Sequence, residues 1–114
     1  MSGISTHILD TSRGVPAAGV RVVLEKEAPG GIWKILADTR TDADGRVKSL
    51  LAPGNDLVAA SYRMRFATGA YWTGQGIEAF HPHVEVAFLI SDPARHHHVP
   101  LLVSPFGYTT YRGT

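Results

Sequence analysis

The segment that most constrains the fold is the alternating run over residues 98–104, which is followed by the turn formers Ser-Pro-Phe-Gly. Successive side chains of a strand point to opposite faces. One face therefore carries Val99, Leu101 and Val103, and the other carries His96, His98, Pro100 and Leu102. The apolar face predicts core, and the turn predicts a hairpin with a second strand over residues 108–113. Imidazoles beside apolar groups are an unusual lining for a face that only meets water.

The same period of two recurs along the chain. It predicts strands over residues 4–10, 19–27, 32–39, 57–66 and 84–90, with turns at 28–31 and 53–56. A short helix is predicted over residues 68–76, with Thr68 as its N-cap. Seven or eight short strands and one small helix are typical of an all-β, antiparallel β-sandwich, built as one domain over residues 1–114.

Composition excludes several classes of function. Eleven basic and ten acidic residues give a net charge of +1, which argues against nucleic-acid binding through a basic surface. No apolar run approaches the ~20 residues that span a bilayer, and the first residues do not resemble a secretory signal. There are no cysteines, so disulfides and thiolate chemistry are excluded. The expectation is a cytoplasmic protein without a membrane segment.

Six histidines raise the question of a metal site. The pairs His81/His83 and His96/His98 are each spaced to share one strand face. Carboxylates near them are few, and no cysteine is available to complete a typical zinc set. We therefore expect no metal and no cofactor, although what these histidines bind stays open. A serine nucleophile is not expected either, because the Gly-x-Ser-x-Gly pattern is absent.

A second set of polar residues is His7, Arg46, His98 and Tyr111. Arg46 follows Gly45 in the segment Asp-Ala-Asp-Gly-Arg, which predicts a type I turn with a bulge that re-aims the arginine. A guanidinium disfavours protonation of nearby imidazoles and offers forked donors to a planar, oxygen-rich ligand. Spacing alone does not prove that these side chains converge, and four unrelated surface residues would fit it as well.

The chain resembles the 5-hydroxyisourate hydrolases, which are the transthyretin-related proteins. The resemblance rests on STHILD (5–10), TDADGR (41–46), FATGAY (66–71) and HVPLLVSPFGYTTYRGT (98–114). It spans the whole chain, and the closing motif is highly specific. Three positions depart from the family pattern: Thr114 replaces the usual Ser, His97 stands where Tyr is frequent, and Trp72 where Phe is common. None of them is one of the four residues above.

The resemblance implies a transthyretin-like β-sandwich that assembles as a homotetramer, a dimer of dimers with active sites between the dimers. It also implies hydrolysis of 5-hydroxyisourate to 2-oxo-4-hydroxy-4-carboxy-5-ureidoimidazoline in urate degradation. His7, Arg46 and His98 match the catalytic residues of the family, and His7, Arg46, Tyr111 and Thr114 match those that contact substrate. Which histidine is the general base stays open.

Two other functions compete with this interpretation. One is a carrier of a thyroid-hormone-like ligand, as in transthyretin itself, which would need apolar walls where this chain has His7, Arg46 and His98. The other is a metal-dependent hydrolase with a different substrate. A face that carries imidazoles, a guanidinium and a phenol suits hydrolysis, which needs a base, an oxyanion stabiliser and a proton donor.

Overall fold

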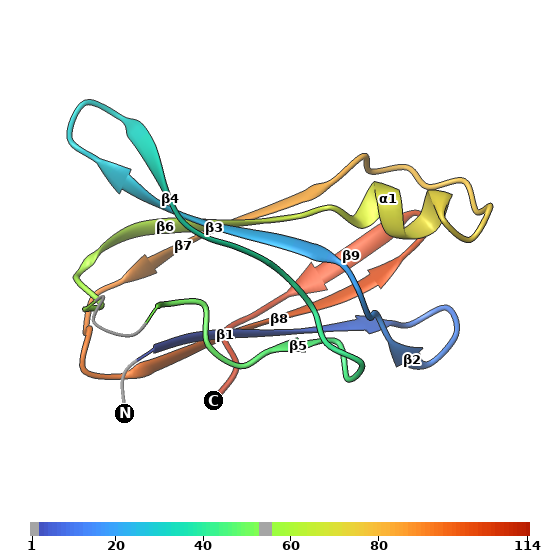
Figure 1. The fold of residues 1–114 in the computed structure, drawn as a ribbon, viewed down its shortest axis with the longest axis horizontal. Helices are drawn as coiled ribbons and strands as arrows, with labels where there is room; N and C mark the ends of the chain where they lie inside the picture. Colours follow the sequence, from blue (N-terminus) through green and yellow to red (C-terminus); the bar gives the residue numbers. More distant parts are fainter. Residues whose placement is uncertain (1–2, 53–55) are drawn as a thin grey trace.

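The chain, described by a computed structural model over residues 3–52 and 56–114, folds into two β-sheets packed face to face (Figure 1). One sheet has the strand order β2-β1-β8-β9, with β5 beside β1, and the other has the order β4-β3-β6-β7. The first sheet is built from β1 (Gly3–Asp10), β2 (Val15–Pro16), β5 (Arg46–Val47), β8 (His96–Ser104) and β9 (Gly107–Thr110). The second is built from β3 (Arg21–Ala28), β4 (Ile32–Arg40), β6 (Ala60–Phe66) and β7 (Val84–Ile90).

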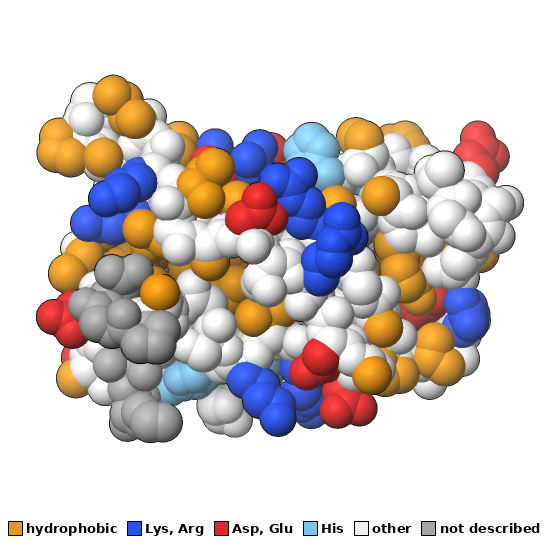
Figure 2. Space-filling model, viewed as in Figure 1, with side chains coloured by type: hydrophobic (Ala, Val, Ile, Leu, Met, Phe, Trp, Pro, Cys, Tyr) orange, Lys and Arg blue, Asp and Glu red, His pale blue; other side chains and the backbone are white. Residues whose placement is uncertain are grey.

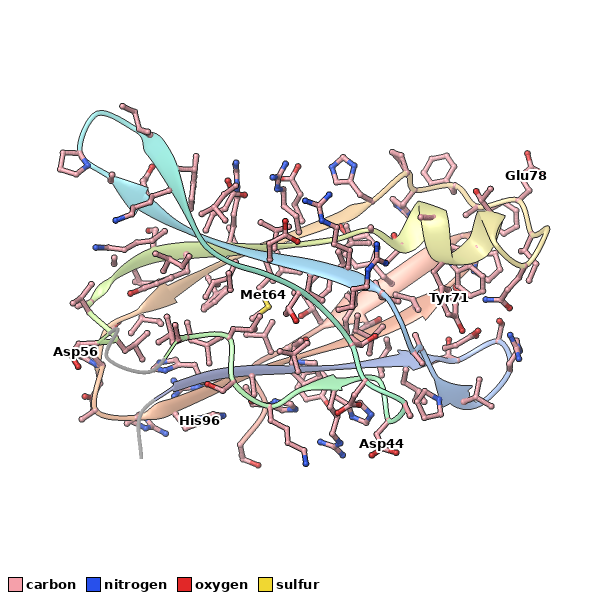
Figure 3. The ribbon with its side chains drawn as sticks, viewed as in Figure 1. Asp44, Asp56, Met64, Tyr71, Glu78 and His96 are labelled. Atoms are coloured by element: carbon pink, nitrogen blue, oxygen red, sulfur yellow. The ribbon has the colours of Figure 1, made fainter. Side chains whose placement is uncertain are left out.

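The core lies between the two layers, where the inward-facing residues of both sheets meet. Ile4, Ile8 and Leu101 of the first sheet and Leu24 and Met64 of the second are fully buried. Figure 3 shows Met64 between the layers. Burial of each such side chain contributes about 1.5–3 kcal/mol, so the alternation seen in the sequence is what holds the sheets together. The predicted β-sandwich is confirmed.

The helix closes one end of the sandwich. Helix α1 (Thr68–Thr73) is shorter than predicted, and its N-cap is Ala67 rather than Thr68. The predicted cap is wrong because Thr68 lies inside the helix, buried, with its hydroxyl unpartnered among the described residues. Trp72 is buried against the core, and the Tyr71 hydroxyl donates to Asp10 Oδ2 at 2.8 Å, which ties the helix to the end of β1.

Strands β6 and β9 depart most from their predicted bounds. Strand β6 begins at Ala60 rather than residue 57, because the Tyr62 hydroxyl lies 2.8 Å from the Val58 carbonyl oxygen and occupies it. Strand β9 ends at Thr110, and Gly113 keeps only an isolated bridge to His98. The turn predicted over residues 53–56 falls largely outside the described residues, which exclude 53–55.

One strand pairing departs from the antiparallel prediction. Strands β1 and β8 run parallel, in a register that places Gly3 opposite His96, Ser5 opposite His98 and His7 opposite Pro100. The other pairings between the described strands are antiparallel. The parallel pair joins the two ends of the chain at the centre of one sheet, and no local turn signal announces it.

The outer faces of the two sheets differ in chemistry. The β4-β3-β6-β7 sheet carries ion pairs such as Arg21–Asp38 at 2.6 Å and Arg63–Glu25 at 2.9 Å, and Arg63 stacks over Trp33. Figure 2 shows this mixture of charges along the upper edge of the molecule. The outer face of the other sheet instead carries His7 and His98 beside the apolar side chains of Leu9, Pro100 and Leu102. Among the described helices, none is long and apolar enough to cross a membrane.

Candidate active site

The outer face of β1, β5 and β8 brings together the polar residues singled out in the sequence. His7 lies directly opposite Arg46 across the β1–β5 pair, and Ser5 lies opposite His98 across the β1–β8 pair. Directly opposed residues of neighbouring strands share a face. His7 and His98 therefore stand on one surface with Arg46 at its edge, although they are distant in the sequence.

Arg46 is held by the turn that precedes it. Gly45 adopts φ +73°, and a Cβ at this position would lie 2.5 Å from the Ile8 carbonyl oxygen. The Asp42 carboxylate accepts hydrogen bonds from the backbone N–H groups of Asp44 and Arg46, at 2.9 and 3.0 Å. The bond from the Arg46 N–H is the main reason why the pKa of Asp42 is lowered. The backbone therefore sets the direction of Arg46, as the turn signal predicted.

Two neighbouring depressions cover this face. One, of about 330 Å³, is lined by His7, Leu9, His98, Pro100, Leu102, Tyr111, Gly113 and Thr114. The other, of about 250 Å³, is lined by Ser5, Thr6, Arg46, Val47, Lys48, His96, His98 and Thr114. His98 and Thr114 line both depressions, so every predicted site residue borders one continuous region. A third groove, also of about 250 Å³, lies toward β7 and shares His98 and Tyr111 with these depressions.

The surroundings of His98 lower its affinity for a proton. Its half-buried imidazole has a lowered pKa, first because burial disfavours the charged ring, and then because Arg46, His7 and His96 repel the positive charge. His98 is thus neutral at neutral pH and able to accept a proton. The Arg46 guanidinium has no hydrogen-bond partner or carboxylate partner among the described residues, so its donors are free for a ligand.

Three of the remaining histidines, His81, His83 and His97, lie outside this surface. His81 packs edge-on against Phe80 and Tyr108, and His83 pairs with Glu85 at 3.0 Å. His97 points inward and is buried, and its pKa is lowered by burial and then by Arg112. Within the described part of the chain, no cluster of three or more histidine and acidic side chains could hold a metal ion.

Two further residues were missed as members of the site. The Ser5 hydroxyl lies 2.8 Å from His98 Nδ1 and 2.7 Å from His96 Nε2, so it bridges both rings. Lys48, exposed at the end of β5, adds a second cation beside Arg46. Ser5 shares the strand face of His7, and that signal was present in the sequence. Its contact with the histidines depends on the β1–β8 register, and the sequence carried no signal for that register.

The fold and these residues define a transthyretin-like β-sandwich whose outer sheet face bears a polar site. The HIUase/Transthyretin family matches residues 4–113, and the chain belongs to this family.

The relatives include named hydrolases and a transthyretin in complex with thyroxine. The 5-hydroxyisourate hydrolase of Caulobacter vibrioides is 46% identical over 119 aligned residues, covering 100% of both chains. The structure of Klebsiella pneumoniae 5-hydroxyisourate hydrolase superposes with a TM-score of 0.86 at 38% identity, covering 99% of this chain and 100% of the other. Sea bream transthyretin in complex with thyroxine superposes with a TM-score of 0.91 at 36% identity, covering 98% and 95%. The fold is therefore common to the hydrolase and to the thyroxine-bound transthyretin, so the fold alone does not decide the function. The side chains of the site must distinguish the two.

Gly113 gives a direct test of how the His98 ring is positioned. Its backbone N–H donates to the His98 carbonyl oxygen at 2.8 Å, and a Cβ there would lie 2.5 Å from His98 Cδ2. Gly113→Ala is expected to displace the ring, which shifts the imidazole NMR resonances of His98 and its titration midpoint. Gly107→Ala is the control, since its Cβ would make only an ordinary 3.8 Å contact. Unchanged His98 resonances in Gly113→Ala would show that the ring is not held by this contact.

Proposed function

We propose that this chain hydrolyses 5-hydroxyisourate to the ring-opened 2-oxo-4-hydroxy-4-carboxy-5-ureidoimidazoline. The observation that supports it most directly is the neutral, half-buried His98 on one surface with His7 and Arg46. Family membership, with relatives named as hydrolases of this compound, supports the same substrate. The proposed reaction uses water and side chains alone, without metal or cofactor.

His7 and His98 share the activation of water and the delivery of a proton to the leaving nitrogen. Positioned acid–base groups of this kind contribute about 10²–10⁴ in rate. The Arg46 fork stabilises the oxyanion that forms at the attacked carbonyl and contacts the substrate oxygens. Tyr111 and Thr114, near the C-terminus of the chain, line the larger depression and contact the ring of the substrate.

A carrier function is less well supported. The named thyroxine complex of sea bream transthyretin shows that this fold can serve such a ligand. The walls of the site here carry two imidazoles and a guanidinium, and these groups would lose hydration against an apolar ligand without gaining partners. The enzyme is therefore the function that these side chains favour.

The first prediction concerns the two histidines. Purified protein is expected to accelerate the loss of near-ultraviolet absorbance of freshly made 5-hydroxyisourate, and to do so equally after treatment with a chelator. His7→Asn and His98→Asn should each lower turnover by about 10²–10⁴ without unfolding the protein, because both side chains lie outside the core. His83→Asn is the control, since His83 lies just before β7 and pairs with Glu85 of the other sheet. A near wild-type rate for either site variant would remove that imidazole from the mechanism.

The second prediction separates the charge of Arg46 from its shape. Arg46→Lys keeps a positive charge but loses the fork, so turnover should fall by about 10²-fold while the acidic limb of the pH–rate profile stays in place. Arg46→Gln also removes the charge, so the pKa of His98 should rise and the acidic limb should move to higher pH. If Arg46→Lys retains full activity, the arginine serves only as a charge.

The third prediction concerns assembly, and we propose a homotetramer with the sites between two dimers. The proposal is supported by the mixed face, where His7 and His98 adjoin the partly exposed apolar side chains of Leu9 and Leu102. Closed symmetric assembly is the usual way in which such faces are covered. Sedimentation should give a tetramer, and Leu102→Glu should shift it toward smaller species with lower activity. A stable, fully active monomer would contradict both the assembly and the shared location of the site.

A further inference from the structure

The Ser5 hydroxyl lies between two histidines and has no role in the proposed mechanism. Ser5 is buried, and its Oγ lies 2.8 Å from His98 Nδ1 and 2.7 Å from His96 Nε2. His98 is half-buried in the site, whereas His96 is exposed at the rim. Figure 3 shows His96 on the outer surface of this sheet. The three groups form a path from the site to solvent.

The number of hydrogens constrains this path. A serine hydroxyl carries one hydrogen and accepts through its lone pairs, so it donates to one ring nitrogen and accepts from the other. If His98 Nδ1 donates to Ser5, then Ser5 donates to His96 Nε2, and both rings carry their hydrogen on Nδ1. In the reverse arrangement both rings carry it on Nε2. The two tautomers are therefore coupled through Ser5.

Each arrangement prepares His98 for one half of a hydrolysis. With hydrogen on Nδ1, the free Nε2 lone pair can accept a proton from the attacking water. With hydrogen on Nε2, the same nitrogen can donate a proton to the leaving nitrogen. Positive charge on the ring between these steps is opposed by burial and by Arg46, which both disfavour the imidazolium. The reaction thus benefits from a route that removes and returns a proton at Nδ1.

We propose that Ser5 and His96 relay a proton to and from His98, so that His98 acts first as base and then as acid. This inference rests on the proposed hydrolysis. As Nε2 takes a proton from water, the Nδ1 proton moves to Ser5 Oγ, the serine proton moves to His96 Nε2, and His96 releases its Nδ1 proton to solvent. Collapse of the intermediate reverses every transfer, and the leaving nitrogen receives the Nε2 proton. The net change at the relay is zero. Ser5 is a positioning residue, because it acts through His98.

The charged groups around the relay favour the exposed end as the place where a proton is held. Arg46, Lys48 and His96 line one depression together with His98, and His7 lines the neighbouring depression with His98. His96 is exposed and therefore more strongly solvated than the half-buried His98. Tyr111 follows β9 on the far side of His98. Water screens a positive charge better at the exposed His96 than at the half-buried His98, so the neighbouring cations oppose a proton less when it passes through His96.

The kinetic test uses the full chain and five variants, two of which are controls. Ser5→Ala and His96→Gln should each lower kcat by up to about 10²-fold with little change in KM, and the double variant should be no slower than the slower single one. Added imidazole should restore His96→Gln, which keeps the serine hydroxyl, but neither Ser5→Ala nor the double variant. Ser104→Ala and His83→Gln, which remove the same groups away from the site, should match wild type.

The outcomes separate the relay from a structural role and from the proposed function. Multiplicative losses in the double variant, or no rescue of His96→Gln by imidazole, would overturn the relay. Absence of wild-type turnover would overturn the proposed hydrolysis instead. Ring-nitrogen NMR then decides the relay without an assay: His96 and His98 should carry their hydrogen on the same nitrogen type, and Ser5→Ala should uncouple them. Hydrogen on Nδ1 of His98 with Nε2 of His96 would show that both rings donate to Ser5 and that no relay exists.

Discussion

The parallel pairing of β1 with β8 is the interaction on which the site depends. It joins two strands from opposite ends of the chain at the centre of one sheet, through eight aligned residue pairs from Gly3–His96 to Asp10–Val103. The register is fixed because Ile4 and Ile8 on one strand and Val99 and Leu101 on the other must face the core together. A slip by one residue would turn these side chains outward and the histidines inward. Core packing therefore also sets the position of Ser5 against His98.

Charge and burial then give this surface its chemistry. The pKa of His98 is lowered mainly by burial and further by Arg46, so the ring is neutral where it would be needed as a base. Arg46 is held at the edge by a left-handed glycine and by the Asp42 carboxylate, which bonds to its backbone and leaves its guanidinium free. The rigid turn thus places a cation near His98 without neutralising it by a carboxylate, and a cation without a partner is suited to an electron-rich ligand.

The two outer faces of the sandwich differ in how well water solvates them. Ion pairs and long charged side chains make the β4-β3-β6-β7 sheet a surface that water solvates well, and an exposed ion pair adds little stability. The outer face of the β2-β1-β8-β9 sheet carries imidazoles, leucines and a tyrosine in place of such ion pairs. A surface of this kind is poorly matched to bulk water alone. This is the face on which we propose that both the substrate and a partner subunit bind.

The sequence by itself determined the fold class and the two faces of β8. Alternation is a local property of a strand, so the inward Val99, Leu101 and Val103 and the outward His98 were predicted correctly. The glycine before Arg46 likewise predicted its own left-handed conformation. The tertiary structure alone decided the parallel pairing, the late start of β6, the early end of β9, and the burial of Thr68. It also placed Ser5 between His96 and His98, at a separation of more than 90 residues. Contacts of that kind follow from how two faces pack in space, and no short stretch of sequence encodes the distance between them.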